Sequence, residues 1–335
     1  MEKEEIKVSV IIPIYNVEKY VEACLQSVCE QSLREIEIIC VNDGSPDNSM
    51  EVVEKIASKD KRIRFLEKEN GGLSSARNAG LRIAMGEFVL FLDGDDALKS
   101  NALEVLYHHM TENDLQQLFF EAEVVYDTPK IEHQNRKKYH TYYRRQQEYP
   151  NPLQGKEMLC RLVDNKEYRM SACLQIFERQ FLMENRLEFE EGIIQEDNLF
   201  TPQALWAANR VMVLKEALYI RRLHESSIMM TKHPADSSWG YYVCMRELQK
   251  LIDQEPEQEE SKNCVQKLIN QLLQEAVAAA CGCEKEPVIQ VLSGKVGKDE
   301  LEEYINAVWE SEYMAYRKSF PGRAKYWLIK KMRLG

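Results

Sequence analysis

Three carboxylates lie within four residues after a short apolar run, and they carry the clearest chemistry in this sequence. Phe88 to Leu92 is fully apolar and leads directly into Asp93, Gly94, Asp95 and Asp96. Carboxylates this close repel one another unless protons or a cation compensate their charge. Oxygen-rich sites suit Mg²⁺ or Mn²⁺, which substrate phosphates often help to hold. The cluster therefore indicates a divalent-cation site, with a solvated acidic turn that caps the next helix as the alternative.

The elements that must position this cluster follow from the pattern of apolar residues. Short apolar runs alternate with longer amphipathic ones over the first 130 residues, which is typical of β-α-β units around a largely parallel sheet. Strands are predicted at residues 8–15, 36–41, 63–66 and 88–92, and helices at 17–32, 49–57 and 73–85. In such sheets ligands bind beyond the carboxyl ends of the strands. The loops after the first, second and fourth strands are therefore expected to converge on one crevice.

The rest of the chain predicts fewer strands and more helices. Strands are predicted at residues 170–177, 211–214 and 218–221, and helices at 198–208, 266–280 and 300–313. Residues 129–152 mix basic and tyrosine side chains and are predicted to be a surface loop, either simply solvated or a flap over a charged substrate. We expect a first domain at residues 1–230, with halves 1–115 and 116–230, and a helical extension at 231–335.

Charge and cysteine content exclude several classes of protein. The chain has 335 residues and a formal net charge of −11, which argues against a protein that coats nucleic acid. The nine cysteines show no C-x-x-C pair, so reduced thiols are expected rather than a zinc site or a disulfide framework. The sequence offers neither a secretory signal nor an apolar stretch of about 18 residues that would span a membrane. A cytoplasmic location is the expectation.

The last basic and aromatic stretch, residues 325–333, has two readings. Its composition suits an interfacial helix on an anionic membrane, which would place the chain peripherally at the inner face of the cytoplasmic membrane. An ordinary amphipathic tail explains it equally well.

Four motifs in order resemble glycosyltransferase family 2. They are VSVIIPIYN at 8–16, VNDGS at 41–45, NGGLSSARNAG at 70–80 and FLDGDD at 91–96. The resemblance is strongest over residues 6–115 and continues more weakly to about residue 230. It implies a GT-A fold, which is an α/β fold with a Rossmann-like, mostly parallel sheet flanked by helices, here with a C-terminal helical extension. It also implies a metal-dependent inverting transferase, similar to hexosyltransferases, that moves a sugar from a nucleoside-diphosphate sugar to an acceptor hydroxyl.

Six residues match positions that line the nucleotide pocket in this family. They are Pro13, Tyr15, Asn42, Asp43, Arg77 and Asn78. Their chemistry agrees, because an aromatic ring can stack on a base and a guanidinium suits phosphate or stacking contacts. Asn42 stands where many members carry a second Asp, so the contact with the base is open between Asn42 and Asp43.

Metal and diphosphate contacts are implied in the same way. Asp95 would be the main metal ligand, and Asp93 would contact the ribose or the metal. The later run YIRRLHESSI at 219–228 resembles the family's region near the diphosphate, so Arg222 and Ser227 would bind there. His224 would contact the metal or phosphate, with a structural histidine as the alternative. The expected cofactor is Mn²⁺ or Mg²⁺.

Glu196 and Asp197 precede a predicted helix, where acidic residues often serve only as caps. In the family a Glu-Asp pair at this place holds the catalytic base, and Asp197 is the candidate. The expected partners are a UDP-sugar donor and a glycan or lipid-linked acceptor in surface polysaccharide synthesis. A catalytically inactive scaffold that binds a nucleotide sugar is the alternative function.

Overall fold

The computed structural model describes residues 5–225, 233–254 and 259–311. Ser227 and the basic tail at 325–333 lie outside these ranges. The chain divides into two compact units, the first formed by residues 1–192 with 196–231 and the second by 193–195 with 232–335. Each unit is described by itself.

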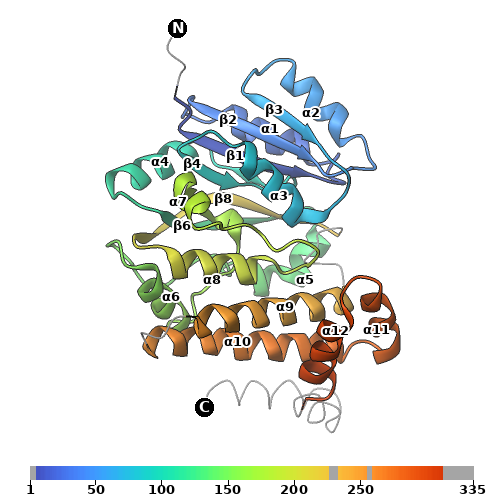
Figure 1. Cartoon of the computed structure of the whole chain (residues 1–335). Helices are drawn as coiled ribbons and strands as arrows, with labels where there is room; N and C mark the ends of the chain where they lie inside the picture. Colours follow the sequence, from blue (N-terminus) through green and yellow to red (C-terminus); the bar gives the residue numbers. More distant parts are fainter. Residues whose placement is uncertain (1–4, 226–232, 255–258, 312–335) are drawn as a thin grey trace. The chain divides into compact units, whose positions relative to one another are not determined.

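One eight-stranded sheet forms the centre of the first unit, in the order β3-β2-β1-β4-β7-β6-β8-β5 (Figure 1). Its first strands are β1 (Val8–Ile14), β2 (Ile36–Asn42), β3 (Ile63–Glu67) and β4 (Phe88–Phe91), which pair in parallel. They are connected by helices α1 (Val21–Cys29), α2 (Ser49–Ala57) and α3 (Gly72–Ile83). Every residue of β1 is buried, as expected for a strand covered on both faces. The predicted β-α-β half is confirmed.

The second half of the sheet is mixed rather than parallel. It contains β5 (Ala97–Leu98), β6 (Gln117–Tyr126), β7 (Gln175–Glu178) and β8 (Val211–Leu223). Strand β7 is antiparallel to both β4 and β6, whereas β6 and β8 are parallel. The sequence did not predict β6. The prediction of two short strands within 211–221 was wrong, because these residues belong to the single strand β8. The polar residues Lys215 and Glu216 lie at a shift in the β6–β8 register, between the partners of Phe119 and Glu121, and do not end the strand.

Helices of the second half include one that contradicts the sequence prediction. They are α4 (Ala102–Glu112), α5 (Pro129–Tyr139), α6 (Gly155–Asp164), α7 (Arg179–Glu184) and α8 (Asp197–Ala207), with a 3₁₀ turn at Ala172–Leu174. Residues 129–139 were expected to be a loop. They form α5 because the Thr128 side chain accepts a hydrogen bond from the Ile131 N–H and Pro129 occupies the first turn.

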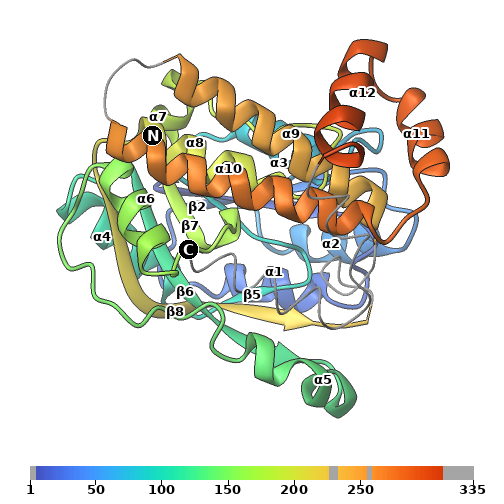
Figure 2. The same ribbon diagram turned by 90° about the horizontal axis from the view of Figure 1, so that it is seen from below.

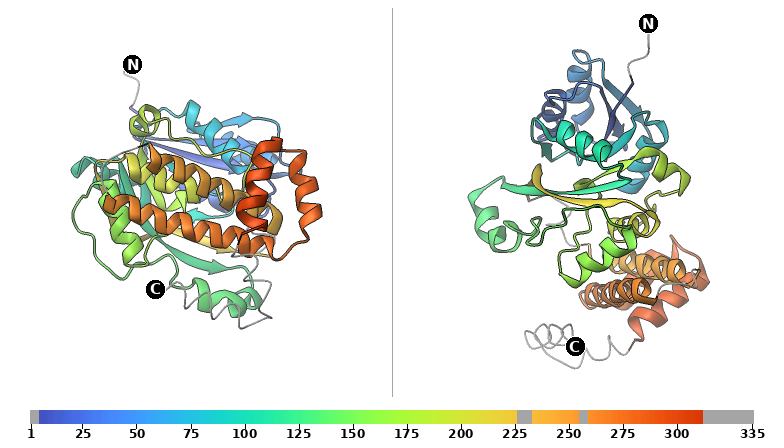
Figure 3. Two further views of the ribbon diagram at one scale, coloured as in Figure 1. Left: turned by 60° about the horizontal axis from the view of Figure 1, so that its bottom comes forward. Right: turned by 90° about the vertical axis from the view of Figure 1, so that its left-hand side faces the viewer.

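The second unit is helical, which confirms the predicted extension. It contains α9 (Pro234–Asp253), α10 (Glu259–Ala280), α11 (Lys285–Ser293) and α12 (Lys298–Tyr304), followed by a π-helical turn at Ile305–Trp309. Helices α9 and α10 run side by side (Figure 3), and their core includes Trp239, Val277 and Tyr304. Within the described ranges, no helix has both the length and the apolar character needed to cross a membrane.

Candidate active site

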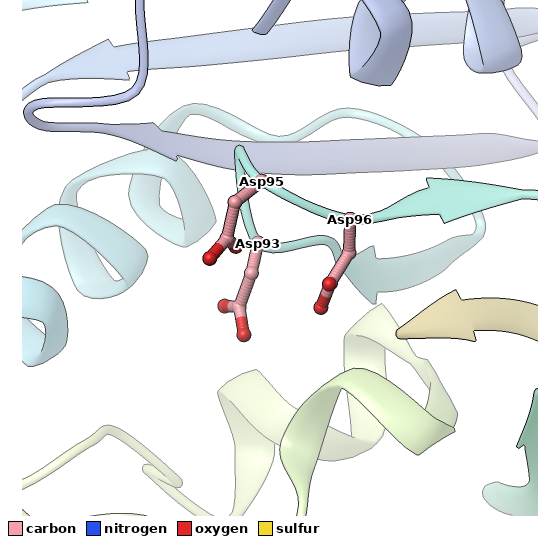
Figure 4. Close-up of side chains that lie close together, drawn as sticks. All are labelled: Asp93, Asp95 and Asp96. Atoms are coloured by element: carbon pink, nitrogen blue, oxygen red, sulfur yellow. The ribbon is translucent and has the colours of Figure 1, made fainter. Parts of the chain in front are cut away.

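The acidic cluster lies in the loop that follows β4. Asp93, Asp95 and Asp96 each offer an oxygen within 4.8 Å of the others, and their side chains point to the same side of the loop (Figure 4). Their surroundings differ, because Asp96 is buried while Asp93 and Asp95 are partly exposed. The three carboxylates therefore cannot be chemically equivalent.

Asp96 fastens β8 to the end of β4. Its carboxylate accepts hydrogen bonds from the Tyr219 hydroxyl at 2.7 Å and the Arg222 backbone N–H at 2.7 Å, and it pairs with the Arg221 guanidinium at 3.0 Å. Burial raises the pKa of Asp96 above its usual range, and Arg221 opposes this rise. A carboxylate with this many protein partners serves the structure more readily than a metal.

Asp93 lies between two arginines. Arg77 Nη2 approaches one carboxylate oxygen to 2.9 Å and Arg221 Nη1 approaches the other to 2.8 Å. The Cys173 thiol donates to the first oxygen at 3.2 Å. Burial by itself would raise the pKa of Asp93, but the two guanidinium groups hold it well below the usual range. Asp93 is thus ionised and already balanced by positive charge, so its metal contact stays a prediction.

Asp95 contacts His224, a residue from a distant part of the sequence. The Nε2 atom of His224 lies 2.8 Å from Asp95 Oδ2, although the two residues are 129 positions apart. The imidazole stacks on the Tyr20 ring, with the ring centroids 4.3 Å apart. The Tyr20 hydroxyl donates to Asp127 at 2.7 Å, and Arg222 pairs with the other oxygen of Asp127 at 3.2 Å. A carboxylate oxygen and an imidazole nitrogen so placed suit a divalent transition-metal ion.

Arg77 lies in the middle of a carboxylate network rather than in an open pocket. It is only 1% exposed, and its Nη1 atom pairs with Glu196 at 2.8 Å and with Asp197 at 3.2 Å. Burial raises the pKa of Glu196 to about 7 and also raises that of Asp197, while Arg77 lowers both. The Asp197 side chain is 21% exposed and that of Glu196 only 9%. Asp197 is therefore the member of the pair that a substrate can reach more easily.

The expected nucleotide residues divide into structural and accessible ones. Asp43 pairs with Lys68 at 2.6 Å and accepts from the N–H groups of Gly71 and Gly72, the latter at a φ of +86° that favours glycine. Asp43 therefore fixes the start of α3.

The side chains of Asn42 and Asn78 also form hydrogen bonds with backbone groups. The Asn42 side chain accepts from the Ser45 N–H at 2.9 Å, and Asn78 bonds both the N–H and the C=O of Phe189 at 2.8 Å. Pro13 lies within β1, whereas Tyr15 just after it is 50% exposed and offers its ring to solvent. The nucleotide contacts of these residues stay predictions.

Sequence reasoning assigned no role to Tyr20 or Cys173, and it placed Arg221 only within the cluster expected near the diphosphate. All three contact expected site residues. Tyr20 stacks on His224, and Cys173 and Arg221 both contact Asp93. No local signal could have found Cys173, because a lone cysteine between apolar residues reads as core. Arg221 belongs to the run at 219–228 that was expected near the diphosphate, and the structure pairs it with Asp93 and Asp96.

Comparison with known proteins identifies the family of this chain. Residues 9–177 match the family model described as glycosyl transferase family 2. The uncharacterised glycosyltransferase EpsJ of Bacillus subtilis is 37% identical over 224 residues, which cover 66% of this chain and 62% of EpsJ. Glycosyltransferase GlyG of Streptococcus pneumoniae is 30% identical over 70% of this chain and 75% of GlyG. Glycosyltransferase GlyA of the same species is 29% identical, and the match spans only 31% of its length.

Solved structures agree in fold. The crystal structure of residues 1–349 of S. aureus TarS in complex with UDP-GlcNAc superposes with a TM-score of 0.63 at 25% identity, over 90% of this chain and 79% of that one. The sheet, the ordered motifs and these likenesses lead to one conclusion: the chain belongs to glycosyl transferase family 2 and is a glycosyltransferase with a GT-A fold.

Proposed function

We propose that this chain is a metal-dependent, inverting glycosyltransferase that uses a UDP-sugar donor. The observation that carries the proposal is the convergence, beyond β4, of the Asp95–His224 pair and the Arg77 network that includes Asp197. The likeness to TarS, which was solved with UDP-GlcNAc, supports UDP as the nucleotide.

The donor set at Asp95 and His224 fits a divalent ion. An anionic oxygen and an imidazole nitrogen lie 2.8 Å apart, and Mn²⁺ accepts both kinds of ligand. Asp95 and His224 would hold the ion, which when bound balances the negative charge of a leaving diphosphate. Asp93, which has one arginine on each carboxylate oxygen, would orient the guanidinium groups of Arg77 and Arg221.

Asp197 is proposed as the general base. It would accept the proton of the acceptor hydroxyl as that oxygen attacks the anomeric carbon from the face opposite the diphosphate. Burial disfavours the charged carboxylate, and Arg77 at 3.2 Å favours it. Arg77 thus acts as a positioning residue that favours the ionised form of Asp197 against the effect of burial and fixes it relative to Asp93.

The remaining roles are assigned by position. Tyr15 would stack on the base, with Asp43 or Asn42 reading its edge, and Arg222 and Ser227 would contact the diphosphate. The acceptor is proposed to be a glycan or a lipid-linked sugar of a surface polysaccharide. A cytoplasmic location, with contact to the inner face of the membrane through residues 325–333, completes the proposal.

Thermal unfolding tests the donor site directly. The chain is heated with UDP, GDP, dTDP or CDP, each with and without Mn²⁺. A ligand that binds only the folded state adds about 2.7 kcal/mol at a hundredfold excess over its Kd. We expect the largest shift with UDP and only when Mn²⁺ is present. A folded chain that shows no shift with any nucleotide would contradict the proposal, and a shift without turnover of any UDP-sugar would favour the inactive scaffold.

A further inference from the structure

Tyr20, directly before α1, contacts two side chains from the end of β8. The His224 imidazole stacks on its ring, with the centroids 4.3 Å apart and the planes at 29°, and the Arg222 guanidinium lies 5.6 Å from the centroid. Side chains alternate along a strand, which explains why Arg222 and His224 both contact Tyr20 while Leu223 between them packs on Ile131. Helix α1 thus lies beside the last part of β8 (Figure 2).

The hydroxyl at the far end of the Tyr20 ring is also held. It donates to Asp127 Oδ2 at 2.7 Å, and the other oxygen of Asp127 pairs with Arg222 at 3.2 Å. Arg222 Nε in turn donates to the backbone oxygen of Asp95 at 3.3 Å, and the Asp95 carboxylate lies 2.8 Å from His224 Nε2. These contacts form a closed cycle of five residues. Packing and hydrogen bonds of this kind lock the torsions of the side chains that form a site.

The imidazole of His224 needs such support to serve as a ligand. A histidine side chain turns about two bonds, and His224 directly follows the last residue of β8. The residue is 6% exposed, and the Tyr20 ring covers one face of the imidazole. Groups that contact a metal-binding imidazole set its orientation and thereby the affinity for the metal. Tyr20 is such a group for His224.

We propose that Tyr20 is a positioning residue that holds the His224 imidazole beside Asp95, so that the two side chains offer a nitrogen and an oxygen to one divalent ion. The proposal rests on the metal-dependent function proposed above. The Tyr20 hydroxyl is engaged by Asp127, so the effect of Tyr20 on a bound ion passes through His224. Mg²⁺ takes oxygen ligands, whereas Mn²⁺ also accepts imidazole. Loss of Tyr20 should therefore weaken the binding of Mn²⁺ more than that of Mg²⁺.

Metal titration of the whole chain in the presence of UDP tests this role. Electron paramagnetic resonance detects free Mn²⁺, and displacement of bound Mn²⁺ by Mg²⁺ gives the affinity for Mg²⁺. We expect Tyr20→Leu to weaken Mn²⁺ binding about tenfold and Mg²⁺ binding less than about threefold. Tyr20→Phe keeps the ring but loses the bond to Asp127, so we expect a loss of about threefold for Mn²⁺ and less for Mg²⁺. His224→Ala should show the same selectivity with a loss at least as large as that of Tyr20→Leu.

Tyr107→Leu is the matched control. Tyr107 of α4 is also half-buried, and its ring contacts Phe88, at the end of β4 away from the acidic cluster. We expect this variant to change both affinities less than about twofold. Thermal unfolding without ligand shows whether each variant folds, and Tyr20→Phe carries the test if Tyr20→Leu does not fold.

Three results would overturn the inference. They are unchanged Mn²⁺ affinity in either Tyr20 variant, an equal loss for Mn²⁺ and Mg²⁺, and an equal loss in Tyr107→Leu. Each of them would leave the proposed transferase function standing, provided that the wild-type chain binds Mn²⁺ with UDP. A wild-type chain that binds no Mn²⁺ in the presence of UDP would instead contradict the metal-dependent function itself.

Discussion

Replacing Arg77 with Met is expected to break the network that joins the two halves of the candidate site. The guanidinium lies 2.9 Å from Asp93, 2.8 Å from Glu196 and 3.2 Å from Asp197, and the residue is 1% exposed. Met fills most of the volume of the arginine stem, so the change removes mainly charge and hydrogen bonds.

The size of the effect follows from this burial. Removing one partner of a buried ion pair destabilises a protein by about 3–5 kcal/mol. The three pairs do not add, because Asp93 keeps its contact with Arg221 at 2.8 Å. We therefore expect the free energy of unfolding to fall by about 3–5 kcal/mol, which lowers the Tm of a unit of this size by roughly 6–20 °C.

The loss is expected to be larger at about pH 8 than at about pH 6. In the native chain, burial raises the pKa of Glu196 to about 7 and raises that of Asp197, and Arg77 opposes both rises. Without Arg77 both pKa values rise further. The folded variant then binds more protons than the unfolded chain over this interval, so its stability falls as the pH rises.

Urea unfolding at both pH values measures the effect, with Arg77→Lys as the control that keeps a charge but not the planar fork. We expect the Lys variant to lie between the wild type and the Met variant. A loss of less than about 1 kcal/mol in the Met variant, or a loss equal at both pH values, would refute the reasoning.

Three further outcomes are expected. Asp197→Asn keeps the UDP–Mn²⁺ thermal shift but lowers the transfer rate at least about a hundredfold, and an unchanged rate would remove Asp197 as the base. His224→Ala is expected to lose the Mn²⁺-dependent part of the shift. A full shift in this variant would show that the imidazole beside Asp95 is not needed for metal binding. Gly80→Ala lowers the free energy of unfolding by about 1–3 kcal/mol in urea, because its Cβ would lie 2.4 Å from Ile11 Cγ2; equal stability would show that Ile11 moves aside.

Local pattern was enough to predict the first half of the fold. Strands β1 to β4 and the helices between them follow from apolar runs and helical spacing, because such periodicity depends on neighbours within a few residues. The order of the motifs along the chain also identified the family, since each motif is a continuous segment.

Local pattern failed where tertiary contacts decide the structure. Strand β6 pairs with β7 and β8, which come 50 to 100 residues later, and the sequence analysis assigned no strand there although most of its residues are apolar. Helix α5 has few apolar residues and owes its position to Leu223 of β8. Propensity alone is a weak guide in such segments, because packing against distant residues supplies the stability.

The candidate site shows the same division. Continuous motifs were enough to point to Asp95, Asp197 and His224 as candidate site residues. The contacts between distant segments place Arg77 between Asp93 and Asp197, and they bring the buried imidazole of His224 to 2.8 Å from Asp95. These pairs are separated by 16 to 129 residues. Their distances depend on the order of strands in the sheet, which no local pattern encodes.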